Sequence, residues 1–454
     1  MGAAVSKKAK GKKKTKTKTK TKGAWPAMAA SRDGGWSALP EDVLLTVMQL
    51  MDVPDVVRSG AACSAWRAAF RRLRLPTPRQ PPCLLYACES YGPSAAALFS
   101  PSSTTFRVPF CGGIAGSAAH GWLFTTDDDA NPFLLNPLTG ARAALPPITT
   151  LHRVKTAGGG AYGVDFALES PSKWERIERV TAKRAREWMF RRVAVSAAGA
   201  GGGGGGVVLL MHMPYAELYF ASPGDARWTS LSVSGAVPHR RNQQWLSVVH
   251  DDDHNGLFYL LRHCGSVFSL DLAAAGHSSP VVRTIMDSKR SYPSPHDPKP
   301  TKYLAVAPRG VGGELLLLVT RRWRKSMIVS ADKTHIEHGV VTTGVEIEEI
   351  RIGKYPVRTV SVSLTGIGGD HALFLGHGSA AVCVPTKDLS MLRPNCAYLT
   401  DDIDGDLLHS PATRRDVGVW DFESSSLHKL GDVWPLRHPW LYSPPPIWIT
   451  PSLY

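Results

Sequence analysis

The sequence predicts a protein of two folded parts, a small all-α module of three helices followed by a large all-β domain. Residues 36–75 repeat apolar positions at three- and four-residue spacing, which is typical of amphipathic helices. Residues 83–454 instead carry short apolar runs of five or six residues, separated by Gly, Pro, Asp and Ser. At 454 residues, the chain is also too long for one ordinary core.

The helical module has recognisable start signals. Pro40 suits the first turn of a helix, because the amide that proline lacks would be unpaired there. Glu41 and Asp42 follow and place negative charge near the positive end of the helix dipole. The pattern restarts at Pro54, and a third segment carries Trp66. Three helices in about forty residues bury little surface, so such a module usually needs a partner or a staple.

Several fixed positions in residues 39–67 follow one register. They are Leu39-Pro40, Asp42, Val43-Leu44, Val47, Leu50 and a closing Cys63-x-x-Trp66-Arg67. In this pattern the module resembles an F-box, although Met48 stands where that family has an aromatic residue. Methionine is a hydrophobic replacement that a core tolerates. The alternative is a three-helix cap that packs on the rest of the chain.

The resemblance to an F-box implies function by recruitment. F-box helices dock on a Skp-type adaptor, which joins a cullin scaffold, and the rest of the chain holds a protein substrate. Catalysis then belongs to other subunits, so neither catalytic residues nor a cofactor is expected here. The resemblance implies the following adaptor-binding residues: Leu39, Pro40, Asp42, Val43, Leu44, Val47, Met48, Leu50, Val53, Cys63, Trp66 and Arg67.

The composition is that of an ordinary globular protein, with 43% hydrophobic and 20% charged residues. The seven cysteines include no C-x-x-C pair, and no apolar leader precedes them, so we expect free thiols in a reducing compartment. No uncharged apolar run approaches the ~18–20 residues of a spanning helix. A membrane-spanning segment is therefore not expected.

The net charge of +15 comes mainly from the N-terminus. Residues 1–22 hold ten lysines and no acidic residue, so the other residues account for only +5. Residues 1–30 are predicted to be a disordered lysine-rich tail. No aromatic residue interleaves the lysines, so base stacking and specific binding of nucleic acid are not expected.

Three interpretations of this tail remain open. Gly2 followed by Ser6 fits the pattern for N-myristoylation, and an acyl chain with a polybasic segment gives weak contact with an anionic membrane. Alternatively, the lysines are a nuclear import signal, which would place the protein in the nucleus, the cytoplasm or both. The tail can also be an inert extension, since Met28 is a plausible natural start.

Residues 76–82 (PTPRQPP) contain four prolines and predict an extended, semi-rigid linker. The β domain that follows at residues 83–454 is too large for a simple sandwich. A β-propeller accommodates many short strands without long exposed edges, and it is the fold we predict. Only residues 174–192 are expected to include a helix.

A repeated unit supports the propeller. Strands ending in a polar residue and a turn recur at Asn136, Asp271 and Asp421, which lie 135 and 150 residues apart. These gaps correspond to three blades each, close to the ~40–50 residues of known blades. A further turn near Pro223 lies 48 residues before Asp271. The spacing predicts six to eight blades, with seven favoured.

Three later segments carry a second resemblance. They are residues 368–385 (GGDHALFLGHGSAAVCVP), 392–402 (LRPNCAYLTDD) and 438–452 (HPWLYSPPPIWITPS). In order and spacing they resemble the plant KIB-type β-propeller, a domain of unknown function that commonly follows an F-box. The resemblance spans roughly residues 83–452 and implies an architecture, but no substrate. The glycine run at residues 199–206 departs from it and predicts a flexible loop.

Three segments contain residues of the kinds found in catalytic or metal sites, but none of them matches the pattern of such a site. Residues 250–254 (HDDDH) lie between two predicted strands and indicate a hairpin loop. Residues 158–163 match G-x-G-x-x-G, but no strand is expected before them and no helix after them. In residues 400–406 (TDDIDGD) the glycine is misplaced for an EF-hand and no glutamate closes the loop. We therefore predict no catalytic residues and no metal.

The aromatic ending, with Trp440, Tyr442 and Trp448, can be a partner peptide or part of the propeller core, and packing is favoured. The sequence as a whole predicts the substrate-recognition subunit of a Skp-cullin-F-box ubiquitin ligase, with substrate contacts on propeller loops. The alternatives are a non-catalytic propeller with a degenerate F-box, a scaffold governed by the basic tail, and a propeller enzyme.

Overall fold

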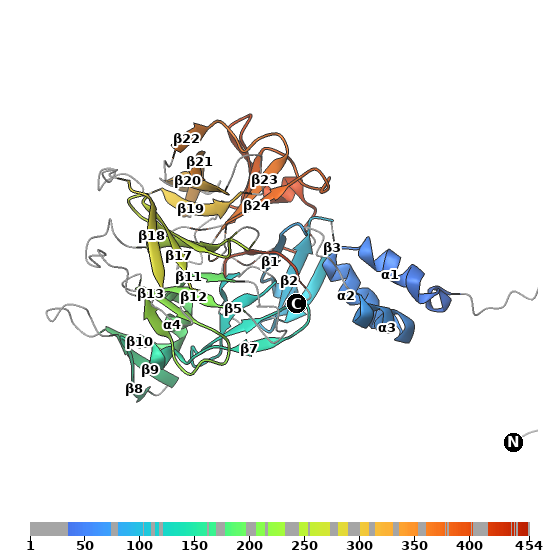
Figure 1. Ribbon diagram of the computed structural model, residues 1–454, viewed down its shortest axis with the longest axis horizontal. Coiled ribbons are helices and arrows are strands. Elements are labelled where there is room, and N and C mark those ends of the chain that lie inside the picture. The colour runs from blue at the N-terminus through green and yellow to red at the C-terminus, as the bar shows by residue number, and fades with distance from the viewer. Residues whose placement is uncertain are drawn as a thin grey trace, which may run out of the picture.

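A computed structural model describes residues 35–73, 80–102, 104–109, 114–117, 121–160, 163–168, 178–196, 206–213, 217–231, 245–252, 255–272, 280–288, 300–307, 314–329, 336–352, 360–376, 378, 381–400, 402, 416–436, 438–439, 441 and 444–452. Three helices at the N-terminal end stand beside a large all-β domain, as predicted (Figure 1). The lysine-rich tail with Gly2 lies outside the described residues, and so do Trp440 and Tyr442.

The helical module consists of a 3-10 turn and three short helices: η1 (Trp36–Ala38), α1 (Glu41–Gln49), α2 (Val53–Ala62) and α3 (Ser64–Arg72). Pro40 is the N-cap residue just before α1, one position earlier than a first-turn proline. A small core holds the helices together, and its buried members are Leu44, Met48, Val56, Trp66, Ala69 and Leu73. Gly60 allows α2 and α3 to approach closely, because a Cβ there would lie 2.8 Å from the Phe70 ring.

The β domain begins with two four-stranded antiparallel sheets. The first joins β1 (Cys83–Tyr86), β2 (Ala95–Ser100) and β3 (Thr104–Pro109) to the C-terminal β28 (Ile447–Ile449) in the order β28-β1-β2-β3. The second contains β4 (Ile114–Ser117), β5 (Leu123–Thr126), β6 (Pro132–Leu135) and β7 (Arg142–Ala144) in chain order. The first and the last described strands of the β domain therefore share one sheet.

The middle of the chain adds three more sheets. A three-stranded sheet contains β8 (Val154–Gly160), β9 (Gly163–Leu168) and β10 (Glu178–Thr181). After α4 (Ala182–Trp188) comes a sheet of β11 (Phe190–Val195), β12 (Val208–His212), β13 (Glu217–Ala221) and β14 (Thr229–Leu231). The next contains β15 (Trp245–His250), β16 (Phe258–Arg262), β17 (Val267–Asp271) and β18 (Val281–Met286).

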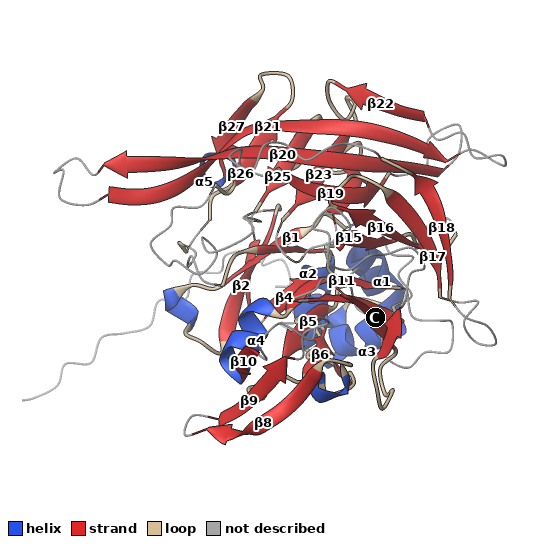
Figure 2. Cartoon of the chain, turned by 90° about the vertical axis from the view of Figure 1, so that its left-hand side faces the viewer, coloured by secondary structure: helices blue, strands red, loops and turns tan. Residues whose placement is uncertain are grey.

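The last sheet has nine strands in the order β22-β21-β20-β19-β24-β23-β25-β26-β27. Its strands are β19 (Thr301–Val306), β20 (Glu314–Val329), β21 (Ile336–Ile352), β22 (Val360–Leu364), β23 (His371–Leu375), β24 (Ala381–Pro385), β25 (Cys396–Leu399), β26 (Gly418–Asp421) and β27 (Ser426–Lys429), followed by α5 (Leu430–Val433). Two parallel pairings, β19 with β24 and β23 with β25, join antiparallel groups into this sheet. The long β20–β21 hairpin projects well beyond the other strands (Figure 2).

The sheets form a ring because their inner strands contact one another in turn: β28 with β4, β4 with β11, β11 with β15, β15 with β19, and β19 with β24. The ring closes where the Trp448 Nε1–H of β28 donates to the Leu375 carbonyl of β23, at 3.2 Å. Because β4 contacts β11 directly, the β8–β10 sheet lies outside this ring. The described strands round the ring thus make four four-stranded sheets and one nine-stranded sheet. The count of six to eight blades stays a prediction.

The turn residues that suggested the repeat occupy equivalent places. Asn136 follows β6, while Asp271 and Asp421 end β17 and β26. Asn136 Oδ1 accepts the Leu138 N–H at 3.0 Å, and Asp421 Oδ1 accepts the Glu423 N–H at 2.8 Å. Such side-chain-to-backbone bonds form Asx turns, which explains why the chain needs Asn or Asp there.

Two expectations for the middle of the chain need correction. Within residues 178–192, the part of this range that the structure describes, the expected helix is α4, and Arg192 lies on strand β11. For the G-x-G-x-x-G segment, neither a preceding strand nor a following helix was expected. A strand, β8, does lead into it, and the element that follows is a second strand, β9. Gly160 ends β8 and pairs with Gly163 at the start of the antiparallel β9, so the segment spans a hairpin connection.

Candidate functional site

The predicted adaptor-binding residues divide into a buried set and an accessible set. The buried side chains are Leu44, Met48, Val53 and Trp66. Those at least partly accessible are Leu39, Pro40, Asp42, Val43, Val47, Leu50, Cys63 and Arg67. A buried residue cannot contact a partner directly, so the four buried residues can only brace the surface. Adaptor binding by the accessible residues stays a prediction.

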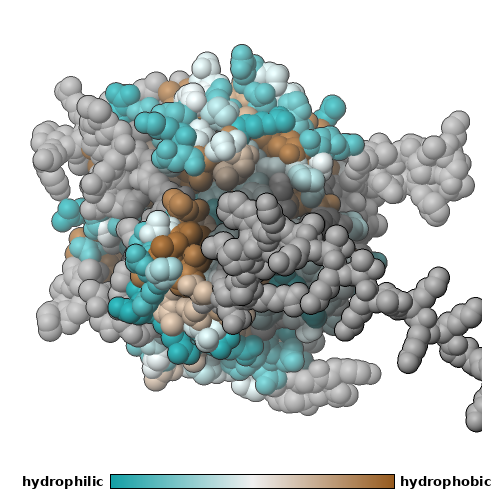
Figure 3. Space-filling view, turned by 90° about the vertical axis from the view of Figure 1, so that its right-hand side faces the viewer, coloured by the Kyte–Doolittle hydropathy of each residue, from teal (hydrophilic) through white to brown (hydrophobic). Residues whose placement is uncertain are grey.

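The accessible apolar surface is concentrated on α1. Leu50, just after the helix, is 86% exposed, and Val43 is 38% exposed. Trp36 of η1 is 71% exposed, and its carbonyl accepts the Trp66 Nε1–H at 3.2 Å, which ties the turn to α3. Figure 3 faces the side of the molecule that carries these helices and shows an apolar patch there. A contiguous apolar patch of this kind is a candidate interaction surface.

Trp36 was missed as a site residue in the sequence. It stands three positions before Leu39, outside the helical periodicity that identified the module. A tryptophan in a stretch of Gly, Asp and Ser was the available signal. Large aromatic residues are enriched at interface centres, so we define the candidate surface as the exposed side chains of Trp36, Val43 and Leu50.

The helical module is attached to the β domain through specific polar contacts. Gln80 Oε1 accepts the buried Val53 N–H at 3.1 Å, which satisfies a donor that the start of α2 would otherwise leave unpaired. Ser100 Oγ on β2 donates to Asp52 Oδ2 at 3.4 Å, and the Arg58 guanidinium lies 5.1 Å from the centre of the Phe106 ring. These contacts hold α2 against β2 and β3.

The linker therefore does more than separate two domains. Gln80, Pro81 and Pro82 are buried, while residues 76–79 lie outside the described part. Because Pro81 and Pro82 are buried, the C-terminal half of the linker is packed between the helical module and the β domain. A fixed junction sets the direction in which the candidate surface on α1 faces relative to the β domain.

A buried ion pair joins two distant parts of the ring. Arg192 Nη2 on β11 lies 2.5 Å from Asp402 Oδ2, which follows β25, and both side chains are almost fully inaccessible. The Thr301 hydroxyl at the start of β19 donates to the Asp402 carbonyl at 3.1 Å. Strands β11 and β25 belong to different sheets, and the β15–β18 sheet lies between them in chain order. The Arg192–Asp402 pair therefore links two strands that no sheet pairing joins.

A second buried arginine completes this cross-link. Arg321 donates from Nη1 to the Thr400 carbonyl at 2.7 Å, from Nη2 to the Asp416 carbonyl at 2.9 Å, and from Nε to Thr342 Oγ1 at 3.0 Å. Burial, followed by the nearby Asp402 carboxylate, raises the pKa of Tyr303 well above its usual range. Burial and the adjacent Arg192 lower the pKa of Arg191 to about 10.

The metal-like sequence motifs serve local or structural purposes. His250 uses both ring nitrogens within its own turn, with Nδ1 2.6 Å from Asp252 Oδ1 and Nε2 3.1 Å from the Gly256 carbonyl. Thr400 and Asp402 of the TDDIDGD segment are buried in the cross-link, and its other residues lie outside the described part, as does His254. No group of three His, Cys, Asp or Glu side chains that could hold a metal occurs within the described ranges.

Acidification should destabilise the fold through His212. This side chain is 1% exposed on β12, and burial lowers its pKa to about 4. Because the folded state disfavours the cation, stability is complete above the unfolded pKa of ~6.5 and is lost as pH falls toward 4, by on the order of 3 kcal/mol. Urea unfolding of the wild type and of His212→Leu between pH 7 and 4 checks this. An equally steep acid dependence in the variant would assign the effect to other groups.

Comparison with protein families identifies both parts of the chain. The F-box domain matches residues 36–77, and the KIB1-4 beta-propeller matches residues 98–421. Among curated relatives in Arabidopsis thaliana, F-box protein At5g25290 is 24% identical over 26% of this chain and 30% of its own length. F-box/kelch-repeat protein At1g57790 is 30% identical over 24% of this chain and 32% of its own length. The matches thus span about a third of each relative.

Among solved structures, the periplasmic gluconolactonase PpgL of Pseudomonas aeruginosa aligns with 62% of this chain and 82% of its own, at 12% identity and a TM-score of 0.25. That likeness is too slight to support an argument about structure or activity. The match to the propeller family, by contrast, extends over most of the chain and begins within β2. The chain therefore belongs to the KIB1-4 beta-propeller family and carries an F-box domain at residues 36–77.

Proposed function

We propose that this protein is the substrate-recognition subunit of a Skp-cullin-F-box ubiquitin ligase. Its F-box would dock on a Skp-type adaptor that joins a cullin, and its propeller would hold a protein substrate for ubiquitination. The chain would act as a non-catalytic adaptor, because ubiquitin transfer belongs to other subunits of such a complex. The arrangement of an F-box fixed to a large propeller supports this division of labour.

The observation that carries the proposal is the exposed apolar surface of Trp36, Val43 and Leu50 on a small module with its own core. Exposed side chains of this size cost solubility unless a partner covers them. Met48, which replaces the aromatic of the F-box pattern, is fully buried and fills the module's core. The departure therefore leaves the outer surface unaltered, which argues against a degenerate F-box.

Co-precipitation of the full-length protein with a Skp-type adaptor and a cullin tests the proposal. We expect Leu50→Asp to weaken adaptor binding by at least about tenfold, since a central interface side chain commonly contributes ~1–4 kcal/mol. Leu50 is 86% exposed, so this substitution leaves the module's core intact. Leu44→Ala is less informative, because Leu44 is buried and its loss would also unfold the module.

Val281→Asp is the matched control for this experiment, because Val281 is an exposed apolar residue on β18, in the β domain. It should bind the adaptor as the wild type does. Normal adaptor and cullin capture by both Leu50→Asp and Val43→Asp would contradict the proposal. The protein would then be a non-catalytic propeller interaction protein.

The cellular location is a separate part of the proposal. We place the protein in the nucleus, the cytoplasm or both, with membrane association through Gly2 and the lysine-rich tail as the alternative. None of the helices that the structure describes is long and apolar enough to cross a membrane. Mass spectrometry of the mature N-terminus distinguishes the two locations, because only the alternative requires an acylated Gly2.

A further inference from the structure

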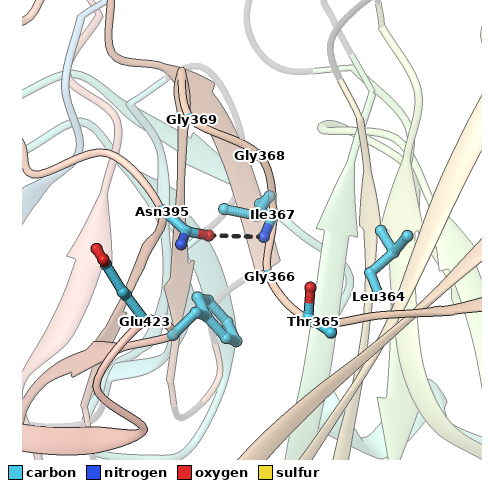
Figure 4. A pocket seen from close by; sticks show the side chains of 9 residues that line it. Leu364, Thr365, Gly366, Ile367, Gly368, Gly369, Asn395 and Glu423 are labelled. Atoms are coloured by element: carbon cyan, nitrogen blue, oxygen red, sulfur yellow. Dashed lines mark hydrogen bonds between the residues drawn. The ribbon is translucent and has the colours of Figure 1, made fainter.

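A pocket of about 610 Å³ opens between the β22–β23 connection and the turn after β26 (Figure 4). Its apolar lining comes from Leu364, Ile367 and Phe422, and its polar lining from Thr365, Asn395 and Glu423. This volume lies within the range of small-ligand sites, which combine apolar walls with a few polar groups. The pocket is separate from the F-box surface and from the buried Arg192–Asp402 pair.

The pocket wall is held in shape by its own backbone contacts. Asn395, with φ of 52°, accepts the Ile367 N–H on Oδ1 at 3.0 Å, as the dashed line in Figure 4 shows. A Cβ on Gly366 would lie 2.3 Å from that Oδ1, so only glycine allows this approach. The Phe422 N–H donates to the Asn395 carbonyl at 3.3 Å, which joins the two sides. The site is therefore formed before a ligand arrives.

The charge of the pocket selects the kind of ligand. Glu423 is exposed and forms no ion pair within the part of the chain that the structure describes, and none of the residues lining the pocket is basic. An anionic ligand would be repelled by this carboxylate. An apolar lining with a single carboxylate at its edge, next to Phe422, suits a side chain with an aliphatic stem and a cationic end.

We propose that this pocket binds a lysine or arginine side chain of the protein partner, with its alkyl stem along Leu364, Ile367 and Phe422 and its charged end at Glu423. This inference rests on the proposed substrate-receptor role and names the chemistry of one recognition subsite. Both cationic side chains share the chemistry that the pocket offers. Arginine would gain more from a bidentate contact with the carboxylate, and lysine would act as a point charge.

Saturation-transfer NMR on the full-length protein tests the subsite with three peptides, Gly-Ser-Gly-X-Gly-Ser-Gly, in which X is lysine, arginine or glutamine. We expect the lysine or arginine peptide to bind at least about threefold more tightly than the glutamine peptide, and this preference to fall at high salt. Glu423→Gln should abolish the preference. Equal binding of all three peptides by the wild type would overturn the proposal.

Gly369→Leu provides an independent variant, because a Cβ at Gly369 meets nothing within 4 Å and the residue lines the pocket. The leucine should fill the pocket and reduce binding of all three peptides. Gly344→Leu is the matched control, since Gly344 on β21 also faces open space and lies outside the pocket lining. If Gly369→Leu and Glu423→Gln both keep the preference for cationic peptides, these peptides bind elsewhere on the protein and the subsite is rejected.

The lysine-rich N-terminal tail is the competing occupant within this chain. Peptide binding that occurs only after deletion of residues 1–27 would show that the chain's own lysines fill the pocket, which contradicts an external partner. Adaptor capture by Glu423→Gln and Gly369→Leu should remain normal. Variants that lose the preference for cationic peptides but still capture the adaptor would thus confirm the subsite. If the wild type itself captures no adaptor, the receptor role is rejected, and the peptide result then concerns the pocket alone.

Discussion

Replacing Asp402 with alanine should destabilise the propeller by about 3–5 kcal/mol, because Arg192 would remain as an uncompensated charge in the interior. The pair is almost fully inaccessible to solvent, and the Arg192 Nη2 atom lies 2.5 Å from the carboxylate. Arg192→Met should have a similar cost, since it leaves the carboxylate without that cation. Urea unfolding at pH 7, followed by tryptophan fluorescence, measures both losses.

The double variant Arg192→Met/Asp402→Ala separates the ion pair from the two side chains. We expect it to be less destabilised than the sum of the single variants, because it leaves no buried charge unpaired. Arg186→Met is the matched control. Its 2.8 Å ion pair with Asp128 lies at the surface, where Asp128 is fully exposed, and such pairs contribute about 0–1 kcal/mol. A loss below about 1 kcal/mol for Asp402→Ala would refute the cross-linking role.

The parts of the fold that depend on local sequence could be predicted. Helix start signals near Pro40 and the apolar spacing of the F-box depend on residues a few positions apart, and α1, α2 and α3 lie where expected. The turn residues Asn136 and Asp421 could be predicted for the same reason, because each bonds to amides two or three positions later. Short strands between such turns were enough to predict a propeller.

The ring itself depends on contacts that are remote in sequence. Arg192 and Asp402 are 210 positions apart, and no local pattern relates them. The F-box resemblance also placed Leu44 and Leu50 together among the adaptor-binding residues, although the first is buried and the second is 86% exposed. The difference arises because α2 and α3 cover Leu44, whereas Leu50 lies just past the end of α1.

The proposed lysine or arginine subsite could not be predicted for a related reason. Its lining comes from three separate segments, 364–369, 395 and 422–423, and only the folded sheet brings them together. Gly366 and Asn395 carry no chemistry that a sequence pattern would single out. Their importance lies in the close approach of the glycine backbone to the Asn395 amide, which becomes evident only from the coordinates.

Trp448→Ala should also destabilise the protein by about 3–5 kcal/mol, because it leaves a large cavity where β1 and β28, the first and last described strands of the β domain, meet. Trp448 is 1% exposed on β28, which pairs with β1 in the first sheet. Its ring contacts Phe374, Tyr398 and Trp434 edge-on, with centroid distances of 5.0, 6.3 and 5.9 Å. The favoured packing role of the aromatic ending thus applies to Trp448.

The expected loss at Trp448 combines packing with ring closure, and two controls separate these contributions. Trp448→Phe keeps an aromatic ring but loses the Nε1–H bond to the Leu375 carbonyl, so it should cost less than alanine does. Trp36→Ala removes an exposed tryptophan and should change stability by less than about 0.5 kcal/mol. Deleting residues 447–454 should be the most severe change, because it exposes the β1 edge and opens the ring. Wild-type stability in Trp448→Ala would mean that β28 does not close the propeller.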